Sequence, residues 1–199
     1  MQTVPVGDAC YPNLYVRTVM SVKALVVYES MYGNTRAIAE GIARGLGNAA
    51  DVTLVAVGQV SDEHVRDADL LVVGGPTHVH SMSRTSTRKA AIEAAAKPDS
   101  GLAVEEGADG RGLREWIADL GELNVRAAAF DTRVQGPVVL MGRAARAIER
   151  SLRNRGATVV ADGESFLVSK SNRLVPGELE RAERWGAQLA ADAVVVARV

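Results

Sequence analysis

The sequence predicts an α/β protein in which a mainly parallel, five-stranded sheet is covered by helices on both faces. Short apolar runs alternate along the chain with segments whose apolar residues recur at helical spacing. The first run, Lys23–Tyr28, is apolar without alternation, as in a strand that is buried on both faces. A chain of 199 residues is long enough to give one such domain a full core.

Five strands are expected, and the fifth is expected in two halves because Asp162 and Gly163 interrupt it. Each run is rich in Val, Leu or Ala, and turn-forming residues bound it. In chain order the expected strands are Lys23–Tyr28, Val52–Val57, Asp69–Val73, Arg126–Phe130, and the pair Ala157–Ala161 and Ser165–Val168.

Helices are expected between these strands, since apolar residues recur there at intervals of three and four. In the first helix this stripe is Ile38, Ile42 and Leu46. Lys97–Gly112, which holds Pro98 and several glycines and acids, is expected to be a surface excursion. The expected helices are Thr35–Leu46, a short one that begins at Ser61, Ser83–Ala96, Leu113–Leu120, Ala144–Arg153 and Glu178–Val196.

Composition narrows the functional classes. The net charge of −1 gives no reason to expect nucleic acid or an anionic membrane as a partner. No apolar run approaches the ~20 residues of a membrane span. The single cysteine, Cys10, excludes an internal disulfide framework, and a reducing cytoplasm is the expected location.

The first 19 residues differ from the rest of the chain. They hold three Pro and Gly residues without clear periodicity, and they lack the basic and apolar regions of a signal peptide. We interpret residues 1–19 as a dispensable extension or the product of a mis-called start codon, and residues 20–199 as the domain. Truncation to Met20 is then expected to leave ligand binding intact.

Three loops are expected at the carboxyl edge of the sheet, where proteins of this architecture bind their ligands. They are Ser30–Thr35 after the first strand, Gly74–Arg84 after the third and Asp131–Val139 after the fourth.

The first loop has the character of a phosphate site. It opens a helix, so its hydroxyls and backbone N–H groups lie at the positive end of a helix dipole. It has neither the lysine of a P-loop nor the G-x-G-x-x-G pattern, and Val57–Gln59 offers no acid for a ribose hydroxyl. These absences disfavour a triphosphate and a dinucleotide, and they leave a terminal monophosphate bound largely by neutral hydrogen bonds.

The loop Ser30–Thr35 after its strand resembles the phosphate loop of the flavodoxin family. Gly74–Thr77 is similar to that family's first flavin loop, and Phe130–Arg133 follows strand four where its second flavin loop lies. Segments Glu164–Val168 and Leu174–Glu180 resemble the C-terminal strand and helix of many bacterial members. The resemblance runs from about Met20 to Ala193, and it implies a three-layer flavodoxin-like sandwich with strand order 2-1-3-4-5.

The resemblance further implies FMN as the cofactor. The phosphate would be bound by Ser30, Met31, Tyr32, Gly33, Asn34 and Thr35. One side of the ring would be lined by Pro76, Thr77, His78 and Val79. The other side, or the ribityl chain, would lie near Phe130, Asp131, Thr132 and Arg133. An acid near the ring, Asp131 or Glu29, is a hypothetical means of lowering the flavin potential.

The implied function is electron transfer or reduction of a small acceptor such as a quinone, with enzyme and electron carrier both open. A redox partner protein or an NAD(P)H-linked reductase would then be the partner. Because Thr77–Arg84 contains no Trp, Tyr or Phe, an alternative is a flavodoxin-like module with weak or lost FMN binding that serves in interaction or sensing.

Other residue patterns favour structural interpretations. His78 and His80 share a face of an extended chain, but a metal site needs more ligands than these two. Ser30 and Ser81 lack the G-x-S-x-G setting of a hydrolase nucleophile. Four arginines at and along the expected helix Ala144–Arg153 recur on one polar face, which is typical of a solvated surface; they are Arg143, Arg146, Arg150 and Arg153.

Overall fold

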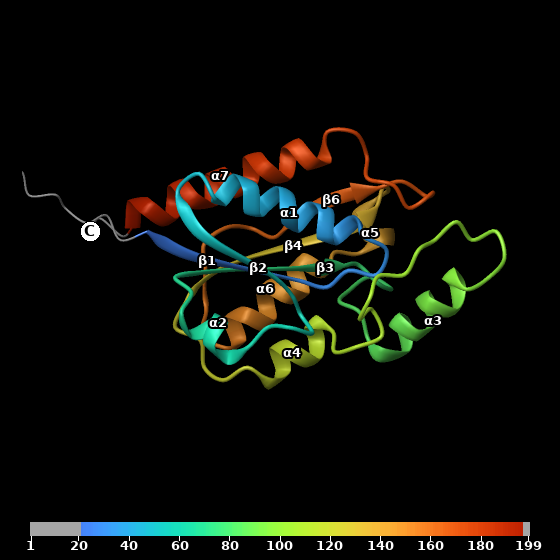
Figure 1. Cartoon of the computed structure of the whole chain (residues 1–199), viewed down its shortest axis with the longest axis horizontal. Helices are drawn as coiled ribbons and strands as arrows, with labels where there is room; N and C mark the ends of the chain where they lie inside the picture. Colours follow the sequence, from blue (N-terminus) through green and yellow to red (C-terminus); the bar gives the residue numbers. More distant parts are fainter. Residues whose placement is uncertain (1–20, 197–199) are drawn as a thin grey trace, which may run out of the picture.

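The computed structural model of the protein describes residues 21–196, so the expected extension at residues 1–19 lies outside the described residues. A single sheet lies between two layers of helices (Figure 1). The strands are β1 Val22–Tyr28, β2 Ala50–Ala56, β3 Leu70–Pro76, β4 Arg126–Val134, β5 Thr158–Val159 and β6 Glu164–Val168. The helices are α1 Asn34–Leu46, α2 Asp62–Arg66, α3 Thr85–Ala95, α4 Leu113–Asp119, α5 Val138–Met141, α6 Ala144–Asn154 and α7 Glu178–Val196.

The sheet is parallel throughout, and its order is β2-β1-β3-β4-β5, with β6 also paired to β4. β5 and β6 follow one another along the same edge of β4: Arg126 pairs with Thr158, and Phe130 pairs with Glu164. They are therefore the two halves of the fifth strand. The predicted fold class and the order 2-1-3-4-5 are confirmed.

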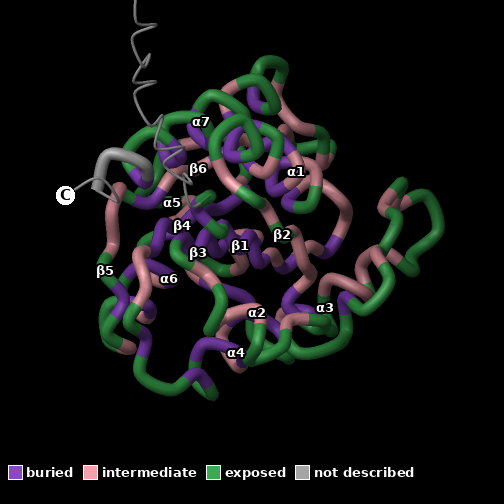
Figure 2. The backbone as a smooth tube through the Cα atoms, turned by 60° about the vertical axis from the view of Figure 1, so that its left-hand side comes forward, coloured by how far each residue is buried: buried purple, intermediate pink, exposed green. Residues whose placement is uncertain are grey.

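Two hydrophobic cores lie on the two faces of the sheet. Helices α1 and α7 cover one face, where Phe130, Phe166 and Trp185 meet edge to face with ring centroids 6.2–6.4 Å apart. Helices α4 and α6 cover the other face, with Trp116 and Ile148 inside. Figure 2 shows that the buried residues lie along the central strands and the inner sides of the helices, and that the exposed residues lie on the outside. Of the helices described, none has both the length and the apolar character that a membrane span requires.

The ends of two strands differ from the prediction. β3 continues to Pro76, and β4 continues through Asp131–Arg133 to Val134, where the sequence predicted a loop. The reason is pairing: β6 supplies backbone partners for Phe130–Val134 that the sequence of β4 alone does not reveal. The short helix α5 begins at the end of the segment Asp131–Val139 that was predicted to be a loop and continues beyond it to Met141.

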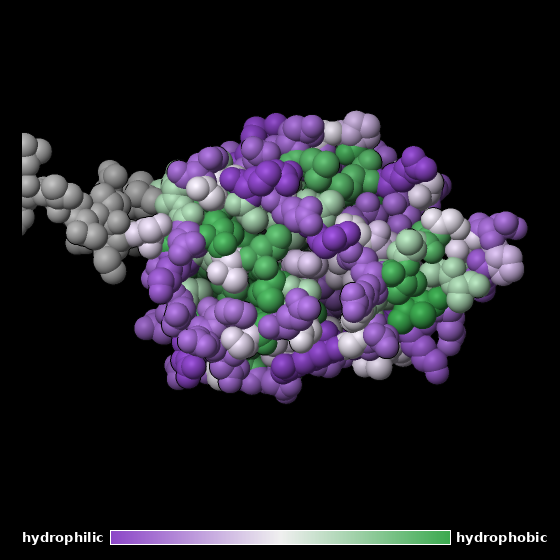
Figure 3. Space-filling model, viewed as in Figure 1, coloured by the Kyte–Doolittle hydropathy of each residue, from purple (hydrophilic) through white to green (hydrophobic). Residues whose placement is uncertain are grey.

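The segment between β3 and α4 projects from the body of the molecule. α3 lies apart from the sheet in both ribbon views (Figures 1 and 2), and Arg88 is its one buried residue. Figure 3 shows apolar side chains gathered over this projection and over the β2 edge, with polar residues between them. We refer to residues 85–112 as the α3 lobe. It lies at the carboxyl end of the sheet and so borders the predicted ligand edge.

Candidate functional site

A cavity of about 150 Å³ opens at the carboxyl ends of β1, β3, β4 and β6. Four separate segments form its wall, and this is the edge at which the sequence predicted a ligand. The lining residues are Met31, Tyr32, Asn34, Thr35, Pro76, Thr77, His78, Thr132, Arg133, Val134, Val168 and Asn172. Nine of the fourteen predicted site residues are among them.

The start of α1 forms one side of this cavity. Gly33 is the N-cap with φ 90°, a left-handed conformation that other residues adopt only with strain, and it shapes the turn from β1 into the helix. The Gly33 N–H donates to Ser30 Oγ at 3.2 Å, so Ser30 holds the turn and does not line the cavity. Within the described chain, no side chain caps α1, and its first turn contains no acid.

Two helices that begin beside α1 at the same edge, α4 and α6, are capped by protein groups. The Leu113 N–H at the start of α4 donates to Glu29 Oε2 at 2.8 Å. At the start of α6, the Ala144 N–H donates to Thr77 Oγ1 at 2.9 Å, and the Ala145 N–H donates to Asp131 Oδ2 at 2.8 Å. The start of α1 therefore differs from its neighbours: its free N–H groups and positive dipole end are available to an anion.

The polar side chains of the first loop are fixed by distant parts of the chain. The Tyr32 hydroxyl donates to the Ala91 carbonyl in α3 at 2.8 Å. The Asn34 amide donates to the carbonyl and side-chain oxygens of Asn172, at 3.0 and 2.9 Å. The hydroxyls of Thr35 and Thr132 lie 2.7 Å apart and are buried. The loop is thus held in shape by the lobe, β4 and the segment after β6.

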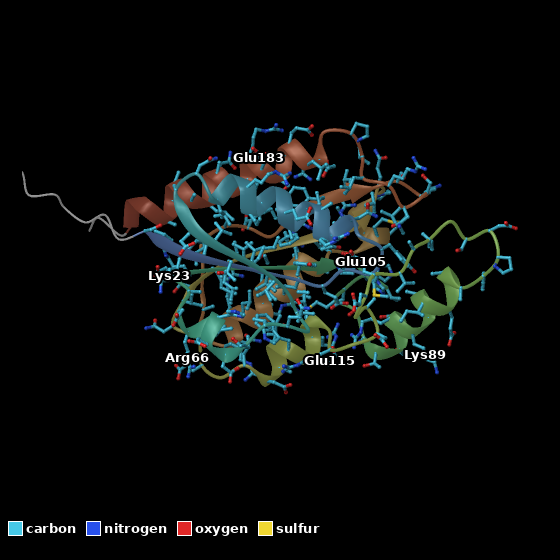
Figure 4. The ribbon with its side chains drawn as sticks, viewed as in Figure 1. Lys23, Arg66, Lys89, Glu105, Glu115 and Glu183 are labelled. Carbon is cyan, nitrogen blue, oxygen red and sulfur yellow. The ribbon has the colours of Figure 1, made fainter. Side chains whose placement is uncertain are left out.

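An ion pair from the α3 lobe lies beside this loop. The backbone N–H of Glu105 donates to the Met31 carbonyl at 3.0 Å, and its carboxylate lies 2.6 Å from Arg36 Nε in the first turn of α1. Figure 4 shows Glu105 at the end of the molecule where α1 begins. Burial, followed by the negative charge of Glu105, raises the pKa of Tyr28 above its usual value. A carboxylate already lies near the place where the sequence predicts a phosphate.

The second predicted loop begins with two glycines that serve packing. A Cβ at Gly74 would overlap the Phe130 ring, and one at Gly75 would lie 2.8 Å from Leu113 Cδ1. Both glycines lie inside β3, so their small size lets β4 and α4 approach the strand. The cavity wall starts after them, at Pro76, where β3 ends.

A tight turn follows at the cavity mouth. The backbones of His78 and Ser81 exchange hydrogen bonds of 2.8 and 3.1 Å, and the two residues between them, Val79 and His80, have φ of 45° and 71°. Positive φ at both central positions is the geometry of a type I′ turn, which favours Asn or Gly and strains a β-branched residue. Val79 does not line the cavity, and 78% of its surface is exposed.

The third predicted segment is strand, and its side chains alternate between the two faces. Phe130 is fully buried in the aromatic cluster of the core, away from the cavity. Asp131 is also fully buried and faces α6, while Thr132 and Arg133 line the cavity. Burial raises the pKa of the Asp131 carboxyl, and the Ala145 N–H partly offsets this effect.

His78, which is half-buried and lines the cavity, is influenced electrostatically by the buried Glu29. Burial lowers the pKa of the His78 imidazole below its usual value, and the charge of Glu29 opposes that shift. Glu29 is buried, and its Oε1 has no hydrogen-bond partner in the described part of the chain. The third histidine lies elsewhere: His64 Nδ1 accepts from the Ser61 N–H in the cap of α2.

Three lining residues were not predicted: Val134, Val168 and Asn172. Val134 and Val168 are register partners at the ends of β4 and β6. Asn172 has φ 56° in the turn between β6 and α7, and an asparagine in a Ser/Lys-rich segment is a recognisable turn signal. Its approach to Asn34 over 138 positions is a tertiary contact that local sequence does not indicate.

A family model described as flavodoxin matches residues 26–185 of the chain. Among solved structures, a flavodoxin from the domain Archaea is 23% identical with a TM-score of 0.57, over 86% of this chain and 99% of that one. Oxidised Flavodoxin 1 from Bacillus cereus is 17% identical with a TM-score of 0.58, over 85% of this chain and 97% of that one.

The Flv1 flavodiiron core from Synechocystis sp. PCC6803 also matches, at 18% identity and a TM-score of 0.57. The match covers 87% of this chain and 36% of that one, so the shared fold is a part of that longer protein. Among curated protein sequences, none matches this chain.

Proposed function

This chain belongs to the flavodoxin family, whose members bind FMN, and on that premise we propose that FMN binds in the cavity between β1, β3 and β4. The phosphate would bind at the start of α1 and the ring would lie toward the cavity mouth. Bound FMN would supply the redox chemistry. The protein's part is to bind the cofactor, orient it and control access to it.

One observation carries this proposal. α4 and α6, which begin at this edge beside α1, are capped by side chains from other elements, and α1 is not capped within the described chain. Its first-turn N–H groups lie beside a cavity that Asn34 and Thr35 line. A dianionic phosphate would satisfy these donors and be stabilised by the helix dipole. The residues present therefore fit the cofactor.

The proposal assigns roles by position. Backbone N–H groups of the loop around Tyr32–Thr35 would hold the phosphate. Pro76, Thr77 and His78 would line one side of the ring, and Thr132 and Arg133 the other. Asp131 does not line the cavity. It would hold β4 and α6 in position, because its carboxylate accepts a hydrogen bond from the Ala145 N–H at the start of α6. Phe130 lies in the core and would not contact the cofactor.

The experiment is a titration of the purified protein with FMN, followed by quenching of flavin fluorescence. We expect Asn34→Asp to weaken FMN binding about tenfold, because a carboxylate would face the phosphate at the helix start. Asn124→Asp, at an exposed position, is the matched control and leaves the affinity unchanged. Equal affinities for all three proteins would contradict the proposed phosphate position.

The same titration decides between the two functional classes. A colourless protein that does not quench FMN fluorescence would support an interaction or sensory module. If FMN binds, reduction by NADH or NADPH without added reductase would identify an enzyme that reduces a small acceptor such as a quinone. Reduction only through a separate protein would identify an electron carrier. We propose the carrier, acting in a reducing cytoplasm, because exposed apolar side chains lie beside the cavity mouth, where a partner protein would dock; they include Val79, Val139 and Leu140.

A further inference from the structure

Exposed apolar side chains lie beside the mouth of the cavity, next to His78. Val139 is 90% exposed, Val79 78% and Leu140 62%. They belong to two segments that touch: His80 forms a β-bridge with Gly142, the residue that joins α5 to α6. We call these three side chains, with Val138 beside them, the apolar rim. Clustered apolar residues at this level of exposure mark a surface that is covered by another molecule.

The apolar rim includes a strained residue. Val79 holds φ 45° in the turn His78–Ser81, where glycine or asparagine would be free of strain. A β-branched residue in this position costs stability, and among residues 21–196 Val79 remains largely exposed, so burial there does not offset the cost. Strain of this kind collects at functional surfaces, and here it presents an apolar side chain at the cavity mouth.

A basic groove of about 340 Å³ lies between α6 and the connection from β5 to β6, and its first lining residue, Arg143, is three positions after Leu140 of the apolar rim. Arginines at positions 143, 146, 150 and 153 line it, together with Glu149 and Asp162. From Arg133 to Arg155 inclusive, the sequence has six arginines and a single acid, whereas the whole chain has a net charge of −1. Positive charge is therefore concentrated beside the apolar rim.

Two arginines of this groove are free to bind another molecule. Arg143 donates to Ser165 and to the Gly163 carbonyl, and Arg153 pairs with Glu149. No hydrogen bond or ion pair holds Arg146 or Arg150 within residues 21–196, and both are exposed. They lie one turn apart on α6, so their guanidinium groups can meet neighbouring carboxylates.

We propose that the apolar rim and the basic groove together form the docking surface for an acidic redox protein. The rim would be buried against an apolar patch around the partner's redox centre, and Arg146 and Arg150 would pair with carboxylates around that patch. Such charges steer the encounter and set orientation, while the apolar contact brings the two redox centres close. This inference rests on the proposed function, because it places the partner over the mouth of the FMN cavity.

Two other occupants fit less well. A second copy of the chain docked through the same face would oppose its own arginines to those of its partner, since a two-fold interface is self-complementary. Nucleic acid would use the arginines but would leave the apolar rim exposed to water. An acidic protein with an apolar centre satisfies both halves of the surface.

The test measures binding of an acidic [2Fe–2S] ferredoxin, used as the probe, to the FMN-loaded protein by calorimetry and by NMR shift mapping. We expect Kd to rise about tenfold or more between low and moderate salt, as exposed charge pairs are screened. Arg146→Glu with Arg150→Glu should weaken binding by about tenfold or more. Val139→Ser with Leu140→Ser should weaken it about fivefold with the salt dependence retained.

Arg66→Glu with Arg184→Glu makes the same change in net charge at exposed positions on α2 and α7 and should leave Kd within about twofold. An equal loss in this control, no binding of the ferredoxin, or an unchanged Kd in the Arg146/Arg150 variant would overturn the inference. So would tighter binding of a DNA duplex to this face, or a dimer that buries Val139. Failure of FMN to bind in the separate fluorescence titration would overturn the proposed function instead, and the two failures are therefore distinguishable.

Discussion

The carboxylate of Glu105 lies 2.6 Å from Nε of Arg36, and the same oxygen would lie 3.9 Å from a Cβ at Gly33. The α3 lobe thus places a negative charge beside the start of α1. The free N–H groups at the start of α1 attract anions. A phosphate bound there would lie close to the negative charge of Glu105. The ion pair also withholds the charge of Arg36 from a ligand.

Glu105→Gln should therefore tighten FMN binding. Removing the charge relieves repulsion of the phosphate and frees Arg36, and we expect a decrease in Kd of about threefold to tenfold at low salt. Fluorescence quenching in the FMN titration measures it. Glu106→Gln removes an exposed neighbouring charge and serves as the control. An unchanged or weaker affinity in Glu105→Gln would show that the phosphate binds elsewhere.

Gly33→Ala should destabilise the protein through the backbone alone. At φ 90° an alanine is strained, yet the nearest atom to its Cβ would be 3.9 Å away, so no clash is added. We expect a loss of about 1–2 kcal/mol in the free energy of unfolding, measured by denaturant titration. Gly58→Ala meets nothing within 4 Å and has no positive φ, and it should leave stability nearly unchanged. Similar losses at both positions would contradict the assigned strain.

The sequence was informative wherever a local rule decides the structure. The apolar run of β1, the stripe Ile38–Leu46 and the glycine before α1 follow from strand burial, helix periodicity and turn chemistry. The order of the sheet followed from the family resemblance and is confirmed. These features need no knowledge of which residues meet across the fold.

Contacts between distant segments account for most of what the sequence did not indicate. Phe130 ends the predicted fourth strand, and its ring packs against Phe166 and Trp185, which the local sequence does not place beside it. Asn172 reaches Asn34 across the fold, and Glu105 crosses from the α3 lobe to α1. The glycines at 74 and 75 resembled a ligand loop, whereas their small size accommodates Phe130 and Leu113.

Glu29→Gln should lower the pKa of His78 further. Burial already depresses this pKa, and the charge of Glu29 is the leading opposing influence. Because its pKa is lowered, the folded protein favours the neutral form of His78. The contribution of His78 to stability is full above its unfolded-state pKa of about 6.5 and is lost as pH falls through its lowered folded-state pKa. An NMR titration of the imidazole protons measures the shift. A His78 pKa that rises or stays constant in Glu29→Gln would exclude the coupling.

Asp131→Asn should remove a pH dependence of stability that has the opposite sign to that of His78. The folded-state pKa of this acid is raised by burial, so its contribution to stability is full below the unfolded value of about 3.9 and is lost as pH rises through the raised folded value. The amide oxygen of asparagine can still accept from the Ala145 N–H. We expect the variant to gain stability relative to the wild type as pH increases, measured by denaturant titrations from acid to neutral pH. Asp51→Asn, at an exposed position, is the control, and parallel curves for Asp131→Asn and wild type would contradict the prediction.

Thr35→Val should test the hydroxyl contact that closes the cavity floor between α1 and β4. The two hydroxyls lie 2.7 Å apart in a buried setting, so removing one leaves Thr132 without this partner, at a cost of about 1–3 kcal/mol in the free energy of unfolding. Thr132→Val should cost a similar amount. The double variant should cost less than the sum of the two, because it removes both polar groups and leaves no unpaired hydroxyl. Strictly additive losses would mean that each threonine acts alone and that the contact does not join helix to strand.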